Sequence, residues 1–464
     1  MDFSISKLLE ENSGRQFDLH TQFLNEQMPK VLKTIGFAKN YVRGEGVYLW
    51  DKEGTQYLDL LCGFGSFNIG RYHPTVVTAI KEALDIKSAS LVQMDAPLLA
   101  GLLAERLIAL MPKKIGKVFF TNSGTETVEA AIKFGRQYTK RDKIVHFKKS
   151  FHGLTTGALS ICGAEEFKKG FGPLLPGNIE IPVNDLEALE AALKNRDVAI
   201  FMFEPILGKG VYVVDYEFLR QAQALCQRYG TLLVSDEIQS GMGRSGKMFA
   251  FEHSGIEPDM VLVSKSFAGG LIPCGAVAMT PDICNATFDR MERCYVQSST
   301  FKMNALAMVA GLATLHVFAN EPIVENAAAR GLQFKNGMEK LIPQFECFGE
   351  VRGVGLMIGM EMQKPQSMKL KLGWSVLDKM SKGLFSQVVS MVLMEKHHIL
   401  TQVAGNNLDV IKILPPLIIT EAQVATFLEA FESVMIDMHK LPGPLWNFGA
   451  SLVKHATVRD SATA

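Results

Sequence analysis

The chain has 464 residues, of which 47% are hydrophobic and 21% are charged, a composition typical of a globular protein with room for a large core and a smaller lobe. Lysine plus arginine and aspartate plus glutamate both number 48, so the formal net charge is zero. That balance argues against a nucleic-acid-binding protein, which needs a basic surplus to neutralise phosphates. A local basic patch remains compatible with it.

The sequence also lacks patterns that are typical of membrane, secreted and metal-binding proteins. No apolar run approaches the roughly 18 residues of a membrane span, and the most apolar stretch, residues 383–394, predicts a core helix. The N-terminus has no apolar signal segment. The seven cysteines are scattered without a CxxC pair, and the ten histidines show no ligand spacing. We therefore expect a cytoplasmic protein with reduced thiols, no metal site and no membrane partner.

In chain order, residues 1–64 are expected to form an N-terminal arm and part of a small domain. Residues 3–36 are helical in part, and GVYLWDKEGTQYLDLL (Gly46–Leu61) predicts a hairpin that turns at KEG. Residues 65–320 are expected to form a large cofactor-binding domain, residues 321–440 a C-terminal small domain, and residues 441–464 a loosely packed tail.

From about residue 100 onward, apolar β-type runs alternate with amphipathic helices. In the helix that begins near residue 124, for example, Val128, Ala131, Ile132 and Gly135 share one face. This alternation predicts βαβ units and a mostly parallel sheet with helices on both faces. The predicted strands are residues 117–122, 143–147, 198–206, 231–237 and 260–265.

The region after residue 320 predicts a second lobe, with strands near residues 349–362 and 398–419. Its last helix carries a single apolar stripe at helical spacing, formed by Val424, Phe427, Leu428, Phe431, Val434, Met435 and Met438.

Polar residues follow each predicted strand, where ligands bind in open α/β sheets. The first strand is followed by Ser123, Gly124 and Thr125, small residues that would free backbone N–H groups at a helix N-terminus. This pattern is typical of a phosphate-binding turn. The alternative is an ordinary serine N-cap beside a glycine turn.

The next two strands deliver different groups. Phe151 and His152 follow the second strand, and an exposed aromatic ring beside a phosphate site could stack on a flat ligand. The alternative for Phe151 is a simple rim aromatic. The third strand delivers Glu204 near its end, just before Pro205.

The last two strands supply the groups that point to a cofactor. Asp236, after the apolar run TLLVS, needs a partner because a buried lone carboxylate is costly. Gln239 can donate to a phenolic oxygen, and Lys265 is either a surface cap on its strand or a reactive amine. A carboxylate for a protonated ring nitrogen, N–H donors for a phosphate and a lysine for an aldehyde together match pyridoxal phosphate.

The motifs TNSGTETVEAA, FHG, FEPI, SDEIQSGMGRSGKMFAFEHSGIEPD, SKSFAGG and SSTF resemble those of the class III aminotransferases. The resemblance runs from about residue 40 to 440 and is greatest to the putrescine and ornithine aminotransferase branch, with pigment-pathway aldehyde aminotransferases also similar. It implies the α/β fold of the aspartate-aminotransferase-like pyridoxal-phosphate enzymes (fold type I), with a large mostly parallel-sheet domain and a smaller α/β domain.

The resemblance also implies roles at matching positions. Lys265 would hold the cofactor as an internal aldimine and then move protons, with Asp236 on the ring nitrogen. Gln239 would contact the ring oxygen. Cofactor binding would further involve Ser123, Gly124, Thr125, Phe151, His152 and Glu204.

In this family a threonine of the STF motif, here Thr300, reaches the phosphate across a subunit interface. The resemblance therefore implies a homodimer and ping-pong transfer of an amino group from an amine or amino acid donor to an aldehyde or keto acceptor.

The chain departs from the family pattern at three places. EPIQGEGG is replaced by EPILGKGV, with Leu207 and Lys209, and STFGGNP is replaced by STFKMNA, with Met303. The arginine of IRxxPPL, which grips a substrate carboxylate, is replaced by Lys412, which keeps the charge but loses the two-pronged fit. We therefore expect a donor or acceptor outside the standard glutamate-type pair, in a pocket that tolerates apolar carbonyls. The alternative is that Lys412 or another arginine still suffices.

Three other functions stay open on the sequence alone. An ornithine- or acetylornithine-type aminotransferase would use 2-oxoglutarate, and an aminomutase or racemase would share the same first proton transfer. A non-catalytic scaffold would be expected to have lost Lys265 or Asp236, and both are present.

Overall fold

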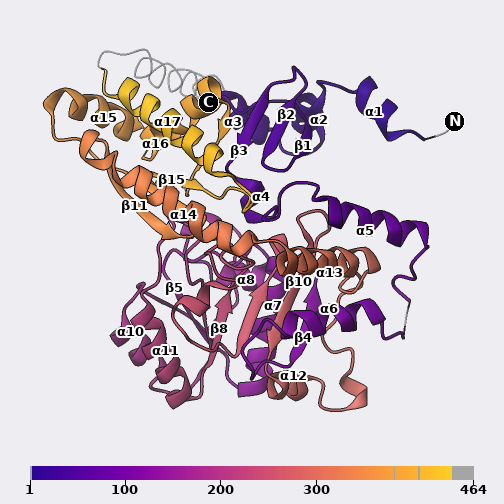
Figure 1. The fold of residues 1–464 in the computed structure, drawn as a ribbon. Coiled ribbons are helices and arrows are strands. Elements are labelled where there is room, and N and C mark those ends of the chain that lie inside the picture. The colour runs from indigo at the N-terminus through magenta and orange to yellow at the C-terminus, as the bar shows by residue number, and fades with distance from the viewer. Residues whose placement is uncertain (1–2, 93, 381, 406–407, 441–464) are drawn as a thin grey trace.

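The computed structural model describes residues 3–92, 94–380, 382–405 and 408–440, so the predicted tail (residues 441–464) lies outside the described residues. Figure 1 shows a large lobe built on one sheet and a smaller lobe to which both ends of the chain contribute. Helix α1 (Ile5–Glu11) extends away from the rest of the molecule, and none of its residues is buried.

The large lobe contains a seven-stranded sheet in the order β4-β10-β9-β8-β7-β5-β6. All five strands predicted for this lobe are present, and neighbours are parallel except where β10 pairs with β4 and β9. The prediction of a mostly parallel sheet is therefore confirmed. The strands are β4 (Lys117–Thr121), β5 (Lys143–Phe147), β6 (Asn178–Ile181), β7 (Val198–Phe203), β8 (Leu232–Asp236), β9 (Met260–Val263) and β10 (Gly275–Met279).

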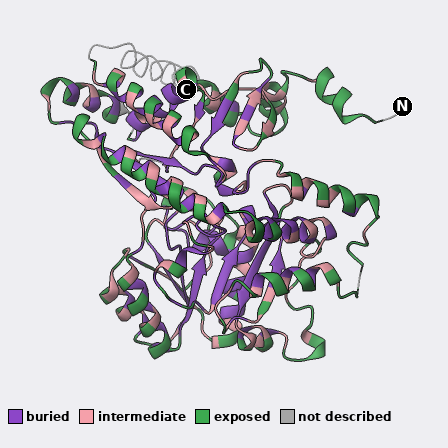
Figure 2. Cartoon of the chain, viewed as in Figure 1, coloured by how far each residue is buried: buried purple, intermediate pink, exposed green. Residues whose placement is uncertain are grey.

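Each face of this sheet packs on its own core. In β9, Met260 and Leu262 belong to one apolar cluster, while Val261 and Val263 belong to the other, because successive side chains of a strand point to opposite faces. The first cluster includes the buried stripe of α7 (Gly124–Thr139). Figure 2 shows the sheet almost wholly buried between helices whose outer faces are exposed.

Helix α7 matches its predicted face and explains its glycine. Val128, Ala131, Ile132 and Gly135 are all buried. A Cβ atom at Gly135 would lie 2.3 Å from a methyl group of Ile200 on β7, so the glycine allows the helix to approach the sheet closely. The other helices of this lobe are α5 (Pro74–Asp85), α6 (Leu98–Ile108), α8 (Thr156–Ser160), α9 (Glu165–Lys168), α10 (Leu186–Leu193), α11 (Tyr216–Tyr229), α12 (Pro281–Thr287) and α13 (Ala305–Asn320), with short 3₁₀ turns η1 (Ala250–His253), η2 (Lys265–Ala268) and η3 (Met291–Arg293).

The N-terminal segment contains three helices and the predicted hairpin. Strands β2 (Tyr48–Asp51) and β3 (Gln56–Asp59) pair antiparallel around the KEG turn, and the short strand β13 (Ile399–Leu400) adds parallel to β3. The two ends of the chain therefore share one sheet. Its remaining members and the nearby helices are β1 (Tyr41–Glu45), α2 (Gln16–Phe23), α3 (Gln27–Thr34) and the short turn α4 (Cys62–Gly65).

A third sheet, in the order β11-β12-β15-β14, forms the C-terminal part of the small lobe. The predicted core helix is α16 (Leu384–His397), and the apolar stripe of the last helix is buried apart from Leu428, which is partly buried against the same core. The elements are β11 (Phe348–Val354), β12 (Met357–Met362), β14 (Gln402–Val403), β15 (Val410–Ile413), α14 (Ile323–Glu339), η4 (Ile342–Gln344), α15 (Met368–Met380) and α17 (Glu421–Met438).

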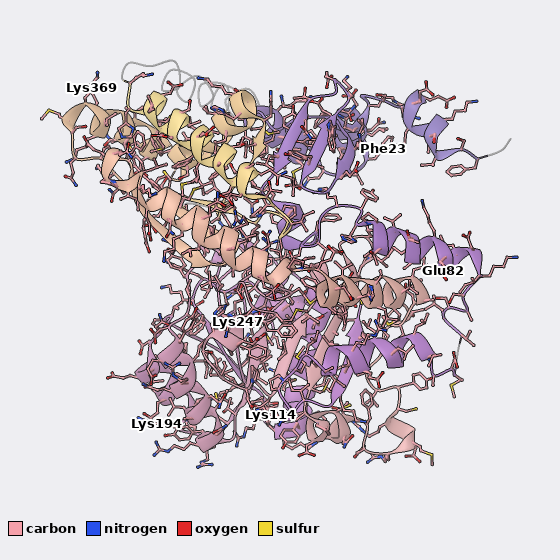
Figure 3. All side chains as sticks on the ribbon, viewed as in Figure 1. Phe23, Glu82, Lys114, Lys194, Lys247 and Lys369 are labelled. Carbon is pink, nitrogen blue, oxygen red and sulfur yellow. The ribbon has the colours of Figure 1, made fainter. Side chains whose placement is uncertain are left out.

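Charged side chains cover the outside of both lobes. Lys194 and Lys369, labelled in Figure 3, are exposed at its edges. Within the described residues, no helix alone has the length and apolar character to cross a membrane, and α13 with the segment from Ile323 to Gln344 reaches them only as a pair bent by 67°.

Candidate active site

The ends of five strands of the large sheet, β4, β5, β7, β8 and β9, lie at one cavity of about 540 Å³, which is lined by residues of both lobes. Strands β9, β8, β7 and β5 are neighbours in the sheet. Asp236 is the last residue of β8, while Lys265, Glu204 and the pair Phe151 and His152 follow β9, β7 and β5, and all of them line this cavity. The structure therefore brings these five residues to one cavity, whereas Ser123 and Thr300 do not line it.

Lys265 lies at the floor of the cavity in an uncommon backbone conformation. It begins η2, with only Ser264 between it and the end of β9, and has a φ of 44°, a left-handed value that costs energy for a residue with a side chain. Burial lowers the pKa of its ammonium, and the negative charges of Asp236 and Glu204 oppose this effect. No hydrogen bond to its Nζ is found within the described residues. Lys265 is thus a half-buried amine that faces a cavity and does not cap the strand.

Asp236 has both carboxylate oxygens engaged. His152 Nδ1 lies 2.7 Å from Oδ2, and the backbone N–H of Ile238 donates to Oδ1 at 3.0 Å. Burial alone would lower the pKa of His152, but the hydrogen bond and the charge of Asp236 outweigh burial, so the pKa is raised. The prediction that Asp236 needs a partner is met by His152, and His152 Nε2 is buried without a partner in the described part of the chain.

Glu204 connects two walls of the cavity. Its carboxylate accepts a hydrogen bond from the backbone N–H of Phe151 at 2.8 Å and another from that of Gly208 at 2.8 Å. Burial raises its pKa, while the positive charge of His152 works in the opposite direction. Through these two hydrogen bonds, Glu204 holds the loop that carries Phe151 against the loop that follows β7.

Phe151 presents its ring to the cavity. Its other contact is with Phe167 of α9, edge to face, with ring centroids 5.6 Å apart. Gly153 follows with a φ of 128°, and a Cβ atom there would lie 2.4 Å from Thr125 Oγ1. This glycine lets the Phe151 loop pass directly over the start of α7.

The start of α7 has features of both alternatives for the TNSGTET motif, an ordinary N-cap and a phosphate-binding turn. Ser123 Oγ accepts a hydrogen bond from the N–H of Glu126 at 3.3 Å, which is an ordinary N-cap, and Ser123 does not line the cavity. Gly124 and Thr125 do line it, and as the first two residues of the helix their N–H groups have no acceptor in the described structure.

Gln239 and Lys412 both line the cavity and are in contact with each other. The ammonium of Lys412 donates to the carbonyl oxygen of Gly208 at 2.8 Å and to Gln239 Oε1 at 3.4 Å, and Gln239 Nε2 donates to the carbonyl oxygen of Phe64 at 3.0 Å. Burial, together with the charge of Lys265, lowers the pKa of Lys412 to about 8. Lys412 thus carries a buried positive charge whose hydrogen-bond partners, in the described structure, are neutral oxygen atoms.

Thr300 lies apart from these residues. It is exposed and does not line the cavity of its own chain. Its neighbour Ser299 accepts a hydrogen bond from Asn122 Nδ2 at 2.7 Å, which ties the STF segment to the end of β4.

A model of the family described as Aminotransferase class-III matches residues 34–435, most of the chain. This chain is a class III aminotransferase.

Several proteins named aminotransferases are similar over most of its length. It is 33% identical over 464 residues to Aminotransferase PigE of a Serratia species, covering 93% of this chain but 54% of that protein, so the chain spans about half the length of this relative. It is 35% identical to an acetylornithine aminotransferase of Caldanaerobacter subterraneus (86% of this chain, 94% of that protein). It is also 35% identical to a putrescine aminotransferase of Pectobacterium atrosepticum (83% and 80%).

Solved structures agree with the fold of this class III aminotransferase. The ornithine aminotransferase of Toxoplasma gondii, reported with partial occupancy of PLP at its active site, superimposes with a TM-score of 0.82 at 25% identity and covers 95% of this chain and 100% of that one. An (S)-enantioselective omega-transaminase of Thermomicrobium roseum gives a TM-score of 0.79 at 26% identity, with the same coverage. The predicted family, fold and enzyme class are confirmed.

Class III aminotransferases use pyridoxal phosphate, and the cavity of this enzyme fits that group. It offers a carboxylate at Asp236 and an aromatic ring at Phe151, and, among the described residues, an amine without a partner at Lys265 and N–H groups without acceptors at Gly124 and Thr125. These are the donor types that an aldehyde, a protonated ring nitrogen, a phosphate and a flat ring require.

The structure adds residues that the sequence did not assign. Arg244, in the quoted SGMGRSG motif, is fully buried and donates to the carbonyl oxygen of Leu356 at 3.0 Å, to that of Pro415 and to the side chain of Asn68. It therefore joins the two lobes. Lys209 and Glu166 form an ion pair that lines the cavity mouth. Lys209 was noticed only as a departure from the family motif, and nothing in the sequence pairs it with Glu166.

Proposed function

We propose that Lys265 is the amine through which this class III aminotransferase holds its cofactor and moves protons during transfer of an amino group from a primary amine or amino acid to a carbonyl acceptor. The observation that carries the proposal is a lysine with a lowered pKa and no hydrogen-bond partner among the described residues, which lines the cavity together with Asp236. An amine in that state is a better nucleophile and base at neutral pH than an ordinary lysine.

The neighbouring residues would orient the cofactor. Pyridoxal phosphate, when bound, supplies an aldehyde and an electron-withdrawing ring. Asp236, kept in place by His152 and the N–H of Ile238, would face the ring nitrogen, and Phe151 would stack on the ring. Gln239 would contact the ring oxygen, while Glu204 keeps the Phe151 loop in position.

The phosphate would bind at the start of α7. The free N–H groups of Gly124 and Thr125 and the helix dipole favour an anion there. Ser123 would bind the phosphate as well, because its hydroxyl accepts a hydrogen bond from the N–H of Glu126 and keeps its own proton to donate.

The working unit would be a homodimer in which Thr300 reaches the neighbouring site. This proposal is supported by the exposure of Thr300 and by large apolar side chains exposed on the segments around it and around residue 92. These side chains are Val92 (55%), Met94 (83%), Met291 (86%), Tyr295 (57%) and Phe301 (59%).

The donor and acceptor would lie outside the glutamate-type pair that an arginine grips. Two of the three N–H donors of Lys412 are already engaged by Gly208 and Gln239, which leaves one for a carboxylate. A single contact is weaker and less directional than the bidentate contact of an arginine.

The test of Lys265 is chemical. The purified protein is reduced with borohydride and digested, and the peptide masses are measured. We expect the mass of the reduced cofactor on Lys265 and none in a Lys265→Ala variant. An unmodified Lys265 in protein that retains the cofactor would overturn the assignment.

The substrate class is tested with a donor screen followed in the visible spectrum. Ornithine, N-acetylornithine, putrescine, alanine and glutamate are compared, because relatives are named for the first three. Release of a keto or aldehyde co-product identifies an aminotransferase reaction and distinguishes it from an aminomutase or a racemase. Strong turnover of glutamate that Lys412→Arg leaves unchanged would contradict the proposed role of Lys412.

A further inference from the structure

The mouth of the active-site cavity contains a charge pair that the roles above do not use. Lys209, in the loop after β7, pairs its ammonium with the carboxylate of Glu166 on α9. Their side chains are 15% and 36% exposed, which places them where the cavity opens to solvent, and both line it.

Lys209 is held in place from the small lobe as well. A Cβ atom at Gly405 would lie 2.8 Å from both Cγ and Cε of Lys209, so the lysine stem packs directly on this glycine. The adjacent N–H of Gly210 donates to the carbonyl oxygen of Ala404 at 3.3 Å. The position of the ammonium is thus fixed by the small lobe on one side and by Glu166 on the other.

Apolar residues also line the cavity, among them Leu154, Phe167, Val403 and Ala404, together with the uncharged polar side chain of Gln402. Each charge of the pair is compensated by the other, so the mouth presents apolar surface and no net charge. An uncharged chain can lie there without disturbing the pair.

A charged chain end cannot do so without cost. An ammonium would be attracted by Glu166 and repelled by Lys209, and a carboxylate would meet the reverse, so neither recovers the hydration it loses on entering. A pair that satisfies itself therefore discriminates against both signs of charge.

We propose that the Glu166–Lys209 pair is a specificity-determining element that selects substrates whose chain beyond the reacting nitrogen or carbonyl is uncharged and apolar. This inference rests on the proposed function, because it takes Lys265 as the reacting end of the cavity. It leads to a specific expectation: removal of one charge should admit substrates that carry the same sign as the charge removed.

The experiment compares three donors of equal chain length: butylamine, putrescine and γ-aminobutyrate, whose far ends are neutral, cationic and anionic. The rate of the donor half-reaction is followed by the change in cofactor absorbance, so no acceptor has to be known. In parallel, calorimetry measures the dissociation constants of versions dimethylated at every amino group, which cannot form an imine with the cofactor.

In the wild type we expect butylamine to be preferred. Lys209→Met should raise the putrescine-to-butylamine ratio, and Glu166→Gln should raise the γ-aminobutyrate-to-butylamine ratio, each by about fivefold, the upper range for a partly exposed charge pair. The double variant Glu166→Gln/Lys209→Met should return to the wild-type order. The charge-reversed variant Glu166→Lys/Lys209→Glu is the matched control and should keep the neutral preference.

Ratios that stay unchanged in both single variants would overturn the inference, as would a wild type that prefers a charged far end in both measurements. If the proposed function fails, no donor changes the cofactor absorbance. The calorimetric ratios then test the pair independently: a response to the substitutions supports the inference, and no response overturns it. Thermal melting of each variant shows whether it folds, and little change is expected because a partly exposed pair stabilises a fold only slightly.

Discussion

At the residue scale, the cation of Lys412 makes the binding of acidic substrates depend on pH. Its pKa is lowered to about 8, so the ammonium is charged below that pH and neutral above it. We expect KM for 2-oxoglutarate to rise as the pH passes through about 8, whereas KM for an uncharged aldehyde should change less.

Lys412→Arg supplies the control, because an arginine stays charged over this range and can bind a carboxylate with two parallel hydrogen bonds. The variant should show a lower and flatter KM for 2-oxoglutarate in steady-state kinetics between pH 6.5 and about 9. An equally flat profile in the wild type would contradict the role given to Lys412.

The buried pair of His152 and Asp236 predicts a pH dependence of stability. The pKa of His152 is raised in the folded protein, so the folded state holds its proton more tightly than the unfolded state does. The resulting stabilisation is fully present below the unfolded value of roughly 6.5 and is lost as the pH rises through the folded value. Denaturant unfolding of wild type and His152→Gln should give curves of stability against pH that converge at high pH and separate at low pH. A difference in stability between the two proteins that widens as the pH rises would contradict the predicted direction of the pH dependence.

At the scale of elements, the start of α7 separates the two functions of Ser123. Ser123→Ala removes the N-cap and should destabilise the protein by about 1 kcal/mol. Ser123→Asp keeps a good cap but brings a negative charge to the proposed phosphate position, so it should preserve stability while weakening cofactor affinity. Thermal melting and absorbance titration with pyridoxal phosphate measure the two effects. Unchanged cofactor affinity in Ser123→Asp would contradict the proposal that the phosphate binds at this turn.

Most elements of the fold follow from periodicity, and those that do not have physical reasons. The strands that were predicted are apolar runs followed by polar residues. β6 (Asn178–Ile181) is a short edge strand with only Ile181 buried, so it lacks an apolar signal. β10 (Gly275–Met279) is wholly buried but consists largely of small residues, a pattern that strands and core helices share.

The site could be predicted as far as each group follows a strand of its own. Asp236, Lys265, Phe151 and Glu204 could be placed because parallel strands end at one edge. The partner of Asp236 could not, since His152 reaches it from 84 positions away and nothing local specifies the contact. The Glu166–Lys209 pair was out of reach for the same reason, and for Thr300 the proposed role stays a prediction.

At the scale of the whole molecule, the exposed apolar segments predict self-association. Met94 and Tyr295 are in contact, with 3.3 Å between Tyr295 Oη and Met94 Sδ, so the two segments form one surface. We expect a dimer in sedimentation velocity, and Met94→Asp with Phe301→Asp should shift it toward monomer with loss of activity. Leu332→Asp, at an equally exposed apolar residue on α14, is the control and should leave the dimer intact. A wild-type monomer that is fully active would contradict the prediction.

The division into residues 1–64, 65–320 and 321–440 also belongs to this scale. The sheet shared by β3 and β13 and the buried Arg244 show how closely the parts are joined. Limited proteolysis would show whether any part is released as a unit, so these boundaries stay predictions.

The two hydrogen bonds accepted by Glu204 have a consequence for how the substrate range of this enzyme can be changed by mutagenesis. One carboxylate positions both the segment under the aromatic ring of Phe151 and the segment that leads to Lys209. Substitutions on these two segments should therefore be epistatic: a change that is tolerated on one will depend on what occupies the other. Libraries that vary both together should recover new substrate ranges that stepwise searches of either one would discard.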